Sequence, residues 1–326
     1  MGILNDYNKT GLSLSKEQEG EMNKLISKHN KNANFFYDEN VCEIIYIPIE
    51  QGELKVYHHK PKKPISKRPV LFLPGFGTSP WSWRHFSSPL FEKVEYYILE
   101  SREKTSSRLY KRRKVRMSIE QMAIDLGVAE EFLGLKDKDY VLFGSSFSGG
   151  IILTALLRQY LSPATVALHD PTKDWRVQRK LSIIFMFVPP FVVRMLRPIL
   201  SKIVLAKMKN KAAKKRYQDF IKHGTVWKWR KTGIQNLKFN IASELKNIQQ
   251  EILLFHGPKD RYHTDEEYLQ MAKEFPNGRY FFMKSAPEFR ELVVGISSLE
   301  LAKITRNEQI PKSLAIFEID LERKKE

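Results

Sequence analysis

Short apolar runs alternate with longer amphipathic stretches along most of the chain, and this rhythm predicts strands alternating with helices. Two of the expected helices begin with a capping box, formed by Ser15 with Gln18 and by Ser118 with Gln121. Such alternation favours a mostly parallel sheet with helices on both faces. Eight runs are expected to be strands: 42–48, 53–58, 70–73, 94–99, 140–143, 165–169, 251–255 and 279–283.

Residues 171–250 break this rhythm, because their apolar positions follow a helical spacing. We therefore expect a helical insertion after the sixth strand, within a core made of residues 41–170 and 251–305. Residues 1–40 are polar and are expected to form a helical N-terminal extension, and residues 306–326 a C-terminal tail.

The segment 139–150, DYVLFGSSFSGG, predicts a buried strand, a tight turn of small residues and an apolar helix. In this context Ser146 would stand on the turn with its hydroxyl exposed, between Gly144 and Ser148. The start of the following helix would favour negative charge beside Ser146. A phosphate-binding loop is the weaker alternative, because the Gly-Lys-Ser/Thr ending is missing.

This turn resembles the G-x-S-x-G nucleophile elbow of the α/β-hydrolase superfamily, with Ser148 in place of the second glycine. The resemblance covers residues 41–305, where the order of elements is that of an eight-stranded α/β-hydrolase fold with a helical lid. It implies that Ser146 is the nucleophile of an acyl transfer and that Asp260, after the seventh strand, is the acid of the triad.

The same resemblance assigns an oxyanion loop to residues 74–77, PGFG, where Pro74 replaces the usual histidine. The N–H groups of Phe76 and Phe147 would be the two oxyanion donors. An ordinary turn at the end of a strand is the alternative for this loop.

The histidine of the triad is the part that the sequence lacks. The loop after the eighth strand reads SAPEF, and Glu288 falls at the position where the family has its histidine. A general base works best when its pKa is near the working pH, and glutamate at about 4.3 is further from neutrality than histidine at about 6.5. His263 and His169 are the candidate substitute bases, and for each a structural or solvated histidine is the alternative.

Cysteine and histidine usage narrows the class of protein further. Cys42 is the only cysteine, so no internal disulfide can form, and the first residues have no signal-peptide core. These features predict a cytoplasmic protein, which could also bind a membrane peripherally. No spacing typical of a metal site is present, and we expect no metal and no cofactor.

Nearly all of the net charge of +18 lies in the insertion. Residues 171–250 carry nineteen Lys and Arg against three acidic residues, an excess of sixteen positive charges. These are interleaved with aromatic residues such as Phe185, Phe187 and Trp229, a pattern that suits an anionic membrane surface or an acidic substrate. A lid with solvated lysines is the equal alternative. No nucleic-acid-binding module is present, so nucleic acid is not an expected partner, and nothing indicates the oligomeric state.

Two functions of different classes therefore follow from the sequence. The first is esterase- or lipase-like hydrolysis of an acyl ester, with an atypical or weakened base. The second is that of a non-catalytic homologue, which binds a small molecule, a lipid or a protein partner under the lid.

Overall fold

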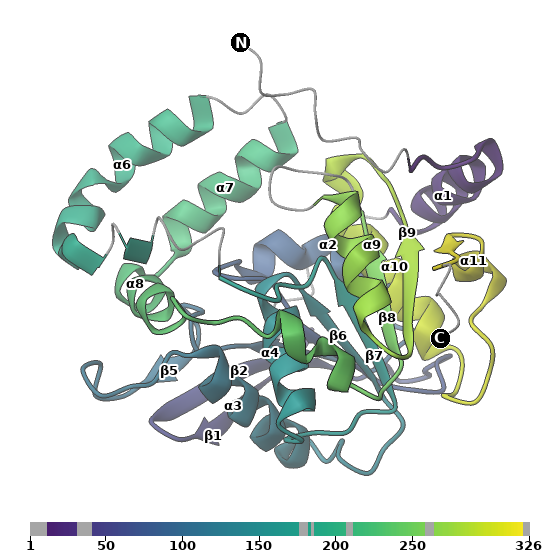
Figure 1. The fold of residues 1–326 in the computed structure, drawn as a ribbon, viewed down its shortest axis with the longest axis horizontal. Helices are drawn as coiled ribbons and strands as arrows, with labels where there is room; N and C mark the ends of the chain where they lie inside the picture. The colour runs from purple at the N-terminus through teal and green to yellow at the C-terminus, as the bar shows by residue number, and fades with distance from the viewer. Residues whose placement is uncertain are drawn as a thin grey trace.

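A mixed β-sheet runs through the centre of the molecule (Figure 1). The computed structural model describes residues 12–30, 41–175, 182–183, 186–206, 211–257 and 264–321. The strands within these ranges are β1 (Glu43–Ile49), β2 (Gly52–His59), β3 (Val70–Leu73), β4 (Tyr96–Glu100), β5 (Arg108–Leu109), β6 (Val141–Ser145), β7 (Thr165–His169), β8 (Ile252–His256), β9 (Gly278–Phe282) and β10 (Glu318–Ile319).

The strand order is β1-β2-β4-β3-β6-β7-β8-β9-β10, and β5 pairs with β2 beside this path. The strands from β4 to β9 are parallel, whereas β1, β2 and β10 pair antiparallel. All eight predicted strands are present, but the described part of the sheet has ten. The two additional strands, β5 and β10, have two residues each and are too short for a periodic pattern to reveal them.

Helices cover both faces of the sheet, as the alternating pattern predicts. On one face pack α3 (Ile119–Phe132), α4 (Phe147–Leu157) and α9 (Asp265–Glu274). On the other pack α1 (Lys16–His29), α2 (Arg84–Leu90), α10 (Arg290–Ala302) and α11 (Lys312–Ala315). Because the parallel strands are buried on both sides, they read as continuous apolar runs.

The two predicted capping boxes differ in the structure. At the start of α1, Ser15 accepts from the backbone N–H of Gln18 at 3.2 Å, and the Gln18 side chain accepts from Ser15 N at 2.8 Å. At the start of α3, Ser118 also accepts from Gln121 N, but the Gln121 amide donates to Asp125 at 3.4 Å instead. The second box is therefore half formed.

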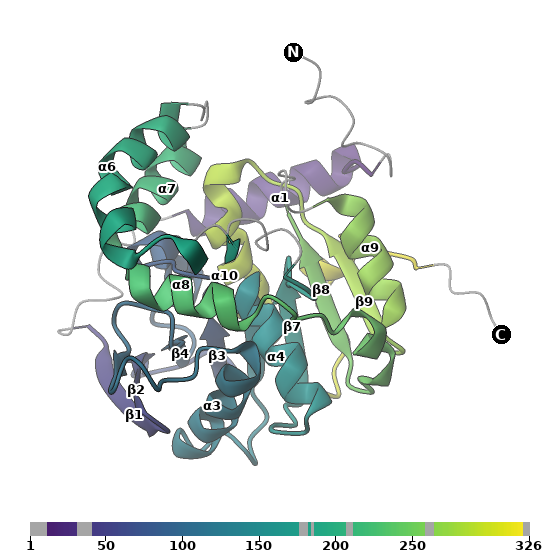
Figure 2. The ribbon, with the colours of Figure 1, turned by 60° about the vertical axis from the view of Figure 1, so that its left-hand side comes forward.

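The insertion after β7 contains α6 (Pro190–Ala206), α7 (Lys211–His223) and α8 (Val226–Gln235), followed by the 3-10 helix η2 (Ala242–Asn247). Figure 2 shows α8 between the α6–α7 pair and the part of the core that holds α3 and α4. None of the helices within the described ranges combines the length and the apolar character that a membrane span requires.

The segment 306–321, predicted as a tail, packs on the core. Leu314 of α11 and Phe317 are fully buried, and Phe317 O accepts from Phe282 N at 2.9 Å. Figure 1 shows α11 beside α1, where Gln18 donates to Ile316 O at 2.6 Å. The two ends of the described chain thus meet on the face of the sheet that α10 covers.

Candidate active site

Ser146 lies on the turn between β6 and α4, with a backbone conformation that non-glycine residues rarely adopt. Its φ is 52° and its ψ is −118°. Hydrogen bonds hold this strained residue on both sides: Ser146 N donates to His169 O at 2.8 Å, and Ser146 O accepts from Gly149 N and Thr172 N at 2.9 and 3.0 Å. The predicted strand–turn–helix context is present, and the Ser146 side chain is half-buried. Strain of this kind is typical of functional turns.

Close contacts explain the small residues around Ser146. A Cβ at Gly144 would collide with Ile152 of α4. Ser148 is fully buried, and its hydroxyl donates to Pro74 O at 2.5 Å. Ser148 and Pro74 each depart from the family's usual motifs at the elbow and the loop, and here they bind each other. Together they fasten the loop after β3 to the start of α4.

The loop 74–77 lies directly against the elbow. A Cβ at Gly75 would be 3.5 Å from Ser146 Cβ, and the rings of Phe76 and Phe147 pack edge to face with centroids 5.2 Å apart. Phe147 is the first residue of α4, so the helix provides no partner for its N–H. Phe76 N–H makes no hydrogen bond to any residue within the described ranges. Phe76 and Phe147 thus lie in contact beside the elbow, and neither N–H has a hydrogen-bond acceptor within the described ranges.

Aromatic side chains of the insertion cover this loop. The rings of Phe220 in α7 and Trp229 in α8 lie 6.4 and 6.0 Å from that of Phe76, and Trp175 lies 5.7 Å from Phe147. The sequence suggested Trp229 as a residue for a membrane surface, but it stacks on Phe220 at 4.1 Å. Aromatic side chains of the loop and of the insertion thus pack on one another beside the elbow.

The residues predicted to transfer protons are described only in part by the structure. Glu288 lies in the 3-10 helix η3 (Pro287–Phe289) and is exposed to solvent. Asp260 and His263 lie outside the described residues. Among the described residues, no histidine makes a hydrogen bond to Ser146 Oγ.

His169 is buried beside the elbow. It pairs with Ser145 in the β6–β7 register, and its Nε2 is 3.1 Å from the place of a Cβ at Gly257, the residue after β8. Its Nδ1 lies 3.1 Å from Asp170 Oδ2. Burial lowers the pKa of His169, and this effect outweighs the opposing charge of Asp170. His169 is therefore neutral, the form in which an imidazole can accept a proton.

Asp170 is the centre of a buried polar cluster that the sequence analysis did not identify. It follows β7 directly, has a φ of 48°, and accepts from His256 Nδ1 at 2.5 Å and Arg290 at 3.1 Å. His256 Nε2 lies 2.9 Å from Asp265 Oδ1. The signal in the sequence was the polar residue that ends each of two adjacent buried strands, His169 in β7 and His256 in β8.

Charge pairing decides the protonation of this cluster. Burial would lower the pKa of His256, but Asp170 and Asp265 raise it to about 9. Burial would raise the pKa of Asp170, but its two imidazole neighbours, His169 and His256, hold it well below its usual value. At neutral pH the cluster thus contains a charged His256 paired with an ionised Asp170. Within the described ranges, no group of three or more His, Cys, Asp or Glu is arranged to hold a metal ion.

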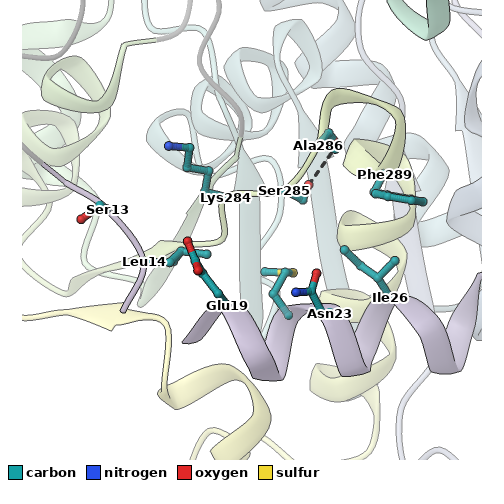
Figure 3. A pocket seen from close by; sticks show the side chains of 10 residues that line it. Ser13, Leu14, Glu19, Asn23, Ile26, Lys284, Ser285, Ala286 and Phe289 are labelled. Atoms are coloured by element: carbon teal, nitrogen blue, oxygen red, sulfur yellow. Dashed lines mark hydrogen bonds between the residues drawn. The ribbon is translucent and has the colours of Figure 1, made fainter. Parts of the chain in front are cut away.

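A cavity of about 460 Å³ lies away from Ser146, between α1 and the loop after β9 (Figure 3). Asn23 and Ile26 of α1 face the segment that carries Ser285, Ala286 and Phe289. The loop in which the family has its histidine is here part of the surface that receives the N-terminal helix.

No family model matches the sequence, and no curated protein matches it. Among solved structures, the chain is similar to a thermophilic esterase from Thermogutta terrifontis, with a TM-score of 0.56 and 16% identity over 73% of this chain and 88% of that one. It is similar to a hydrolase from Pseudomonas aeruginosa PA01, with a TM-score of 0.61 and 11% identity over 78% and 96%. It is also similar to a membrane phospholipase A described as a bacterial virulence factor, with a TM-score of 0.58 and 17% identity over 81% and 84%. At these identities the likeness establishes the fold, and the protein has the fold of the α/β-hydrolase superfamily.

Proposed function

We propose that the protein hydrolyses an acyl ester, with Ser146 as the nucleophile and the N–H groups of Phe76 and Phe147 as oxyanion donors. The observation that carries this proposal is the left-handed backbone of Ser146, at the end of β6 and the start of α4. A serine held in this way presents its hydroxyl at the carboxyl end of the sheet, beside the start of a helix that favours negative charge. Tetrahedral intermediates of acyl transfer carry such a charge.

The aromatic lining favours an ester with an apolar acyl group. Phe76 and Phe147 belong to the core side of the site, and Trp175, Phe220 and Trp229 to the insertion. The similar proteins include an esterase and a phospholipase A by their own descriptions. A lipid ester is therefore a reasonable substrate class for the proposed site.

The base is atypical in this proposal. Glu288 occupies the place of the family's histidine and is exposed to solvent, and carboxylates are in general weaker bases than imidazoles. Asp260 is proposed as the acid of the triad, and His263 and His169 as substitute bases. We expect slow hydrolysis, because the oxyanion donors and substrate binding alone leave about a thousand- to ten-thousandfold acceleration over water.

Labelling with a fluorophosphonate tests the nucleophile directly. The wild type should take one label, and digestion followed by mass spectrometry should find it on the peptide that contains Ser146. Ser146→Ala should remain unlabelled, whereas Ser145→Ala, which removes a buried hydroxyl one residue earlier, should be labelled. A label on another serine, or none on the wild type, would contradict the proposal.

Binding without turnover is the second candidate function. The observation that favours it is that Ser146 Oγ has no histidine partner within the described ranges. A protein that stays unlabelled, yet is stabilised against heat by a non-hydrolysable acyl ether, would have this function. A wild type that reacts with the probe would exclude it.

We also propose that the lid contacts an anionic lipid surface. Phe191, Met195 and Ile199 of α6 are spaced four residues apart, and each is more than half exposed, as is Phe187 just before the helix. Arg194 and Lys202 are also exposed on α6. An exposed apolar stripe with neighbouring cations is complementary to anionic headgroups over an acyl layer.

Vesicle co-sedimentation tests this contact. Binding should require anionic lipid and should weaken as salt rises, and the variant Phe191→Ser/Met195→Ser should bind less. Phe132→Ser is the matched control, because Phe132 is a half-exposed phenylalanine of α3, outside the lid. Equal binding of all three proteins, or equal binding to neutral vesicles, would refute a role for the stripe.

A further inference from the structure

The basic segment that follows β4, residues 101–116, begins with four residues that lie in the interior of the protein. Arg102 and Glu103 are fully buried, Lys104 is 1% exposed, and Ser101 is also buried. Buried charges are rare unless they are paired or hydrogen-bonded. The two cations of this segment have different partners, and the partners of Lys104 belong to the proposed oxyanion loop.

The side chain of Lys104 binds residues 75–78, the loop that follows β3. Its Nζ donates to Gly75 O and, at 3.0 Å, to Thr78 Oγ1. Thr78 Oγ1 also donates to Gly75 O, at 2.7 Å. Gly75 O therefore accepts from a buried ammonium group and from a hydroxyl, which is a strong constraint on one peptide group.

That carbonyl belongs to the same peptide group as the N–H of Phe76. The peptide is trans, so its C=O and its N–H point in opposite directions. When Lys104 fixes the oxygen, it fixes the N–H of Phe76 on the opposite face of the loop. A cation on the oxygen also polarises the amide and makes its N–H a stronger donor.

Neighbouring groups keep Lys104 in this place. Glu103 Oε1 lies 3.3 Å from Lys104 Nζ and accepts from Gly77 N at 3.5 Å, so adjacent residues bind both ends of the short loop. From the lid, Lys228 of α8 donates to Lys104 O and, at 2.7 Å, to Ser107 O. The contact thus joins the lid, the buried segment and the loop beside Ser146.

We propose that Lys104 is the positioning residue of the oxyanion hole, which it serves by orienting and polarising the Phe76 N–H through Gly75 O. This proposal rests on the proposed function of Ser146. Lys104 does not touch the substrate. Its effect is confined to the step of the reaction in which negative charge develops on the substrate oxygen.

The variant Glu103→Gln/Lys104→Met tests this role, because it removes the cation without leaving its acidic neighbour unpaired. The rate constant for fluorophosphonate labelling should fall by roughly tenfold to a hundredfold, while the final labelled fraction stays the same. For an ester substrate, kcat should fall and KM should change little. A merely structural role would lower the labelled fraction or the melting temperature and leave the rate per folded molecule unchanged.

The matched control is Arg102→Met/Asp125→Asn. It neutralises another buried ion pair of the same segment, but Arg102 donates to Glu50 O and Arg116 O and not to the oxyanion loop. This control should label at the wild-type rate. Equal rates for the wild type and the Lys104 variant would overturn the role of Lys104 alone, whereas an unlabelled wild type would refute the proposed function.

An NMR measurement that needs no turnover tests the orientation of the Phe76 amide separately from activity. In protein labelled with ¹⁵N-phenylalanine, the Phe76 amide resonance should move in Glu103→Gln/Lys104→Met and keep its position in Arg102→Met/Asp125→Asn. An unchanged Phe76 resonance in the first variant would contradict the proposed orientation, whatever the activity.

Discussion

The two sides of Ser146 are built differently. On the side of the loop 74–78, Ser148 binds Pro74 O, Lys104 binds Gly75 O, and aromatic rings of the lid cover Phe76. At the position where the family has its histidine, Glu288 is exposed to solvent. The loop side is thus held by several buried contacts, whereas no histidine within the described ranges makes a hydrogen bond to Ser146 Oγ.

A complete serine-hydrolase site combines two contributions to the rate, stabilisation of the oxyanion and transfer of a proton, and this difference separates them. One oxyanion donor is worth about 3 to 4 kcal/mol in the transition state, and a positioned base typically contributes a hundred- to ten-thousandfold in rate. A site with the first and a weak form of the second would still react with an activated probe. It would turn over an ordinary ester slowly.

The largest expected effect concerns the cluster around Asp170. Asp170→Asn keeps a residue type that tolerates a positive φ but removes the buried carboxylate that binds His256 and Arg290, so that His256 retains only Asp265 as a charged partner. We expect a loss of about 3 to 5 kcal/mol in the free energy of unfolding, measured by urea denaturation. Asp139→Asn, which affects the more exposed ion pair with Arg68, should cost less. If Asp170→Asn instead keeps its free energy of unfolding and reacts more slowly with the fluorophosphonate, Asp170 takes part in the reaction. The side of Ser146 that lacks the histidine would then not be purely structural.

The pH dependence of stability should identify His256 within this cluster. Its pKa is raised to about 9 in the folded protein, above about 6.5 in the unfolded chain, so its stabilising effect is complete below pH 6.5 and is lost as pH rises through 9. The effect amounts to about 3 kcal/mol. Wild type and His256→Gln should therefore differ most near pH 6 and converge toward pH 10. A difference that is constant with pH would show that His256 is neutral in the folded protein.

Two glycines of the oxyanion loop should respond differently to the same substitution. Gly77 has a φ of 62°, and a Cβ there would lie 2.5 Å from Phe220 and 2.9 Å from Trp229. Gly77→Ala should cost roughly 1 to 3 kcal/mol in unfolding free energy, by strain and by overpacking. At Gly75 a Cβ would find ordinary contacts at 3.5 Å, so Gly75→Ala should cost less than about 1 kcal/mol. Equal costs would mean that the lid does not press on this loop.

The smallest expected effect comes from restoring a histidine. Glu288→His places an imidazole with a pKa near neutrality at the family's position and should raise ester hydrolysis about tenfold, the low end for a base, because the site is exposed. The gain should appear between pH 6 and pH 8 and be absent from Glu288→Gln. Fast wild-type turnover that is lost in His169→Ala or His263→Ala would identify a substitute base instead.

Local patterns in the sequence were sufficient for most of the fold. The parallel strands are fully buried, so β3 and β6 appear as uninterrupted apolar runs, and Ser15 marks the start of α1 through its capping box. The turn at Ser146 is also local, because its strand, its serine and its helix follow one another directly in the sequence. Such features need only neighbours in the chain.

Features that depend on distant partners were not predictable in this way. Lys104 and Lys228 looked like surface cations, but their ammonium groups donate to backbone carbonyls that any sequence would provide. Lys231 likewise donates to the carbonyls of Arg112 and Arg113. Residues 101–116 and helix α8 can therefore lie side by side although both are basic. Part of the positive charge of the insertion thus binds backbone carbonyls of the protein itself. The acid–histidine contacts of Asp170 also depend on the packing of two strand ends, those of β7 and β8.

The short β10 strand has a consequence for the behaviour of the protein at high concentration. Glu318 and Ile319 pair with Phe281 and Tyr280, so they occupy the outer hydrogen-bonding edge of β9. At the other end of the sheet, Pro48 interrupts the row of donors in β1. An open edge of a buried parallel sheet is a template on which further chains can add as strands. Strand β10 thus covers part of the edge of β9, and we expect that removal of residues 312–321 would expose this edge to pairing with strands of other molecules.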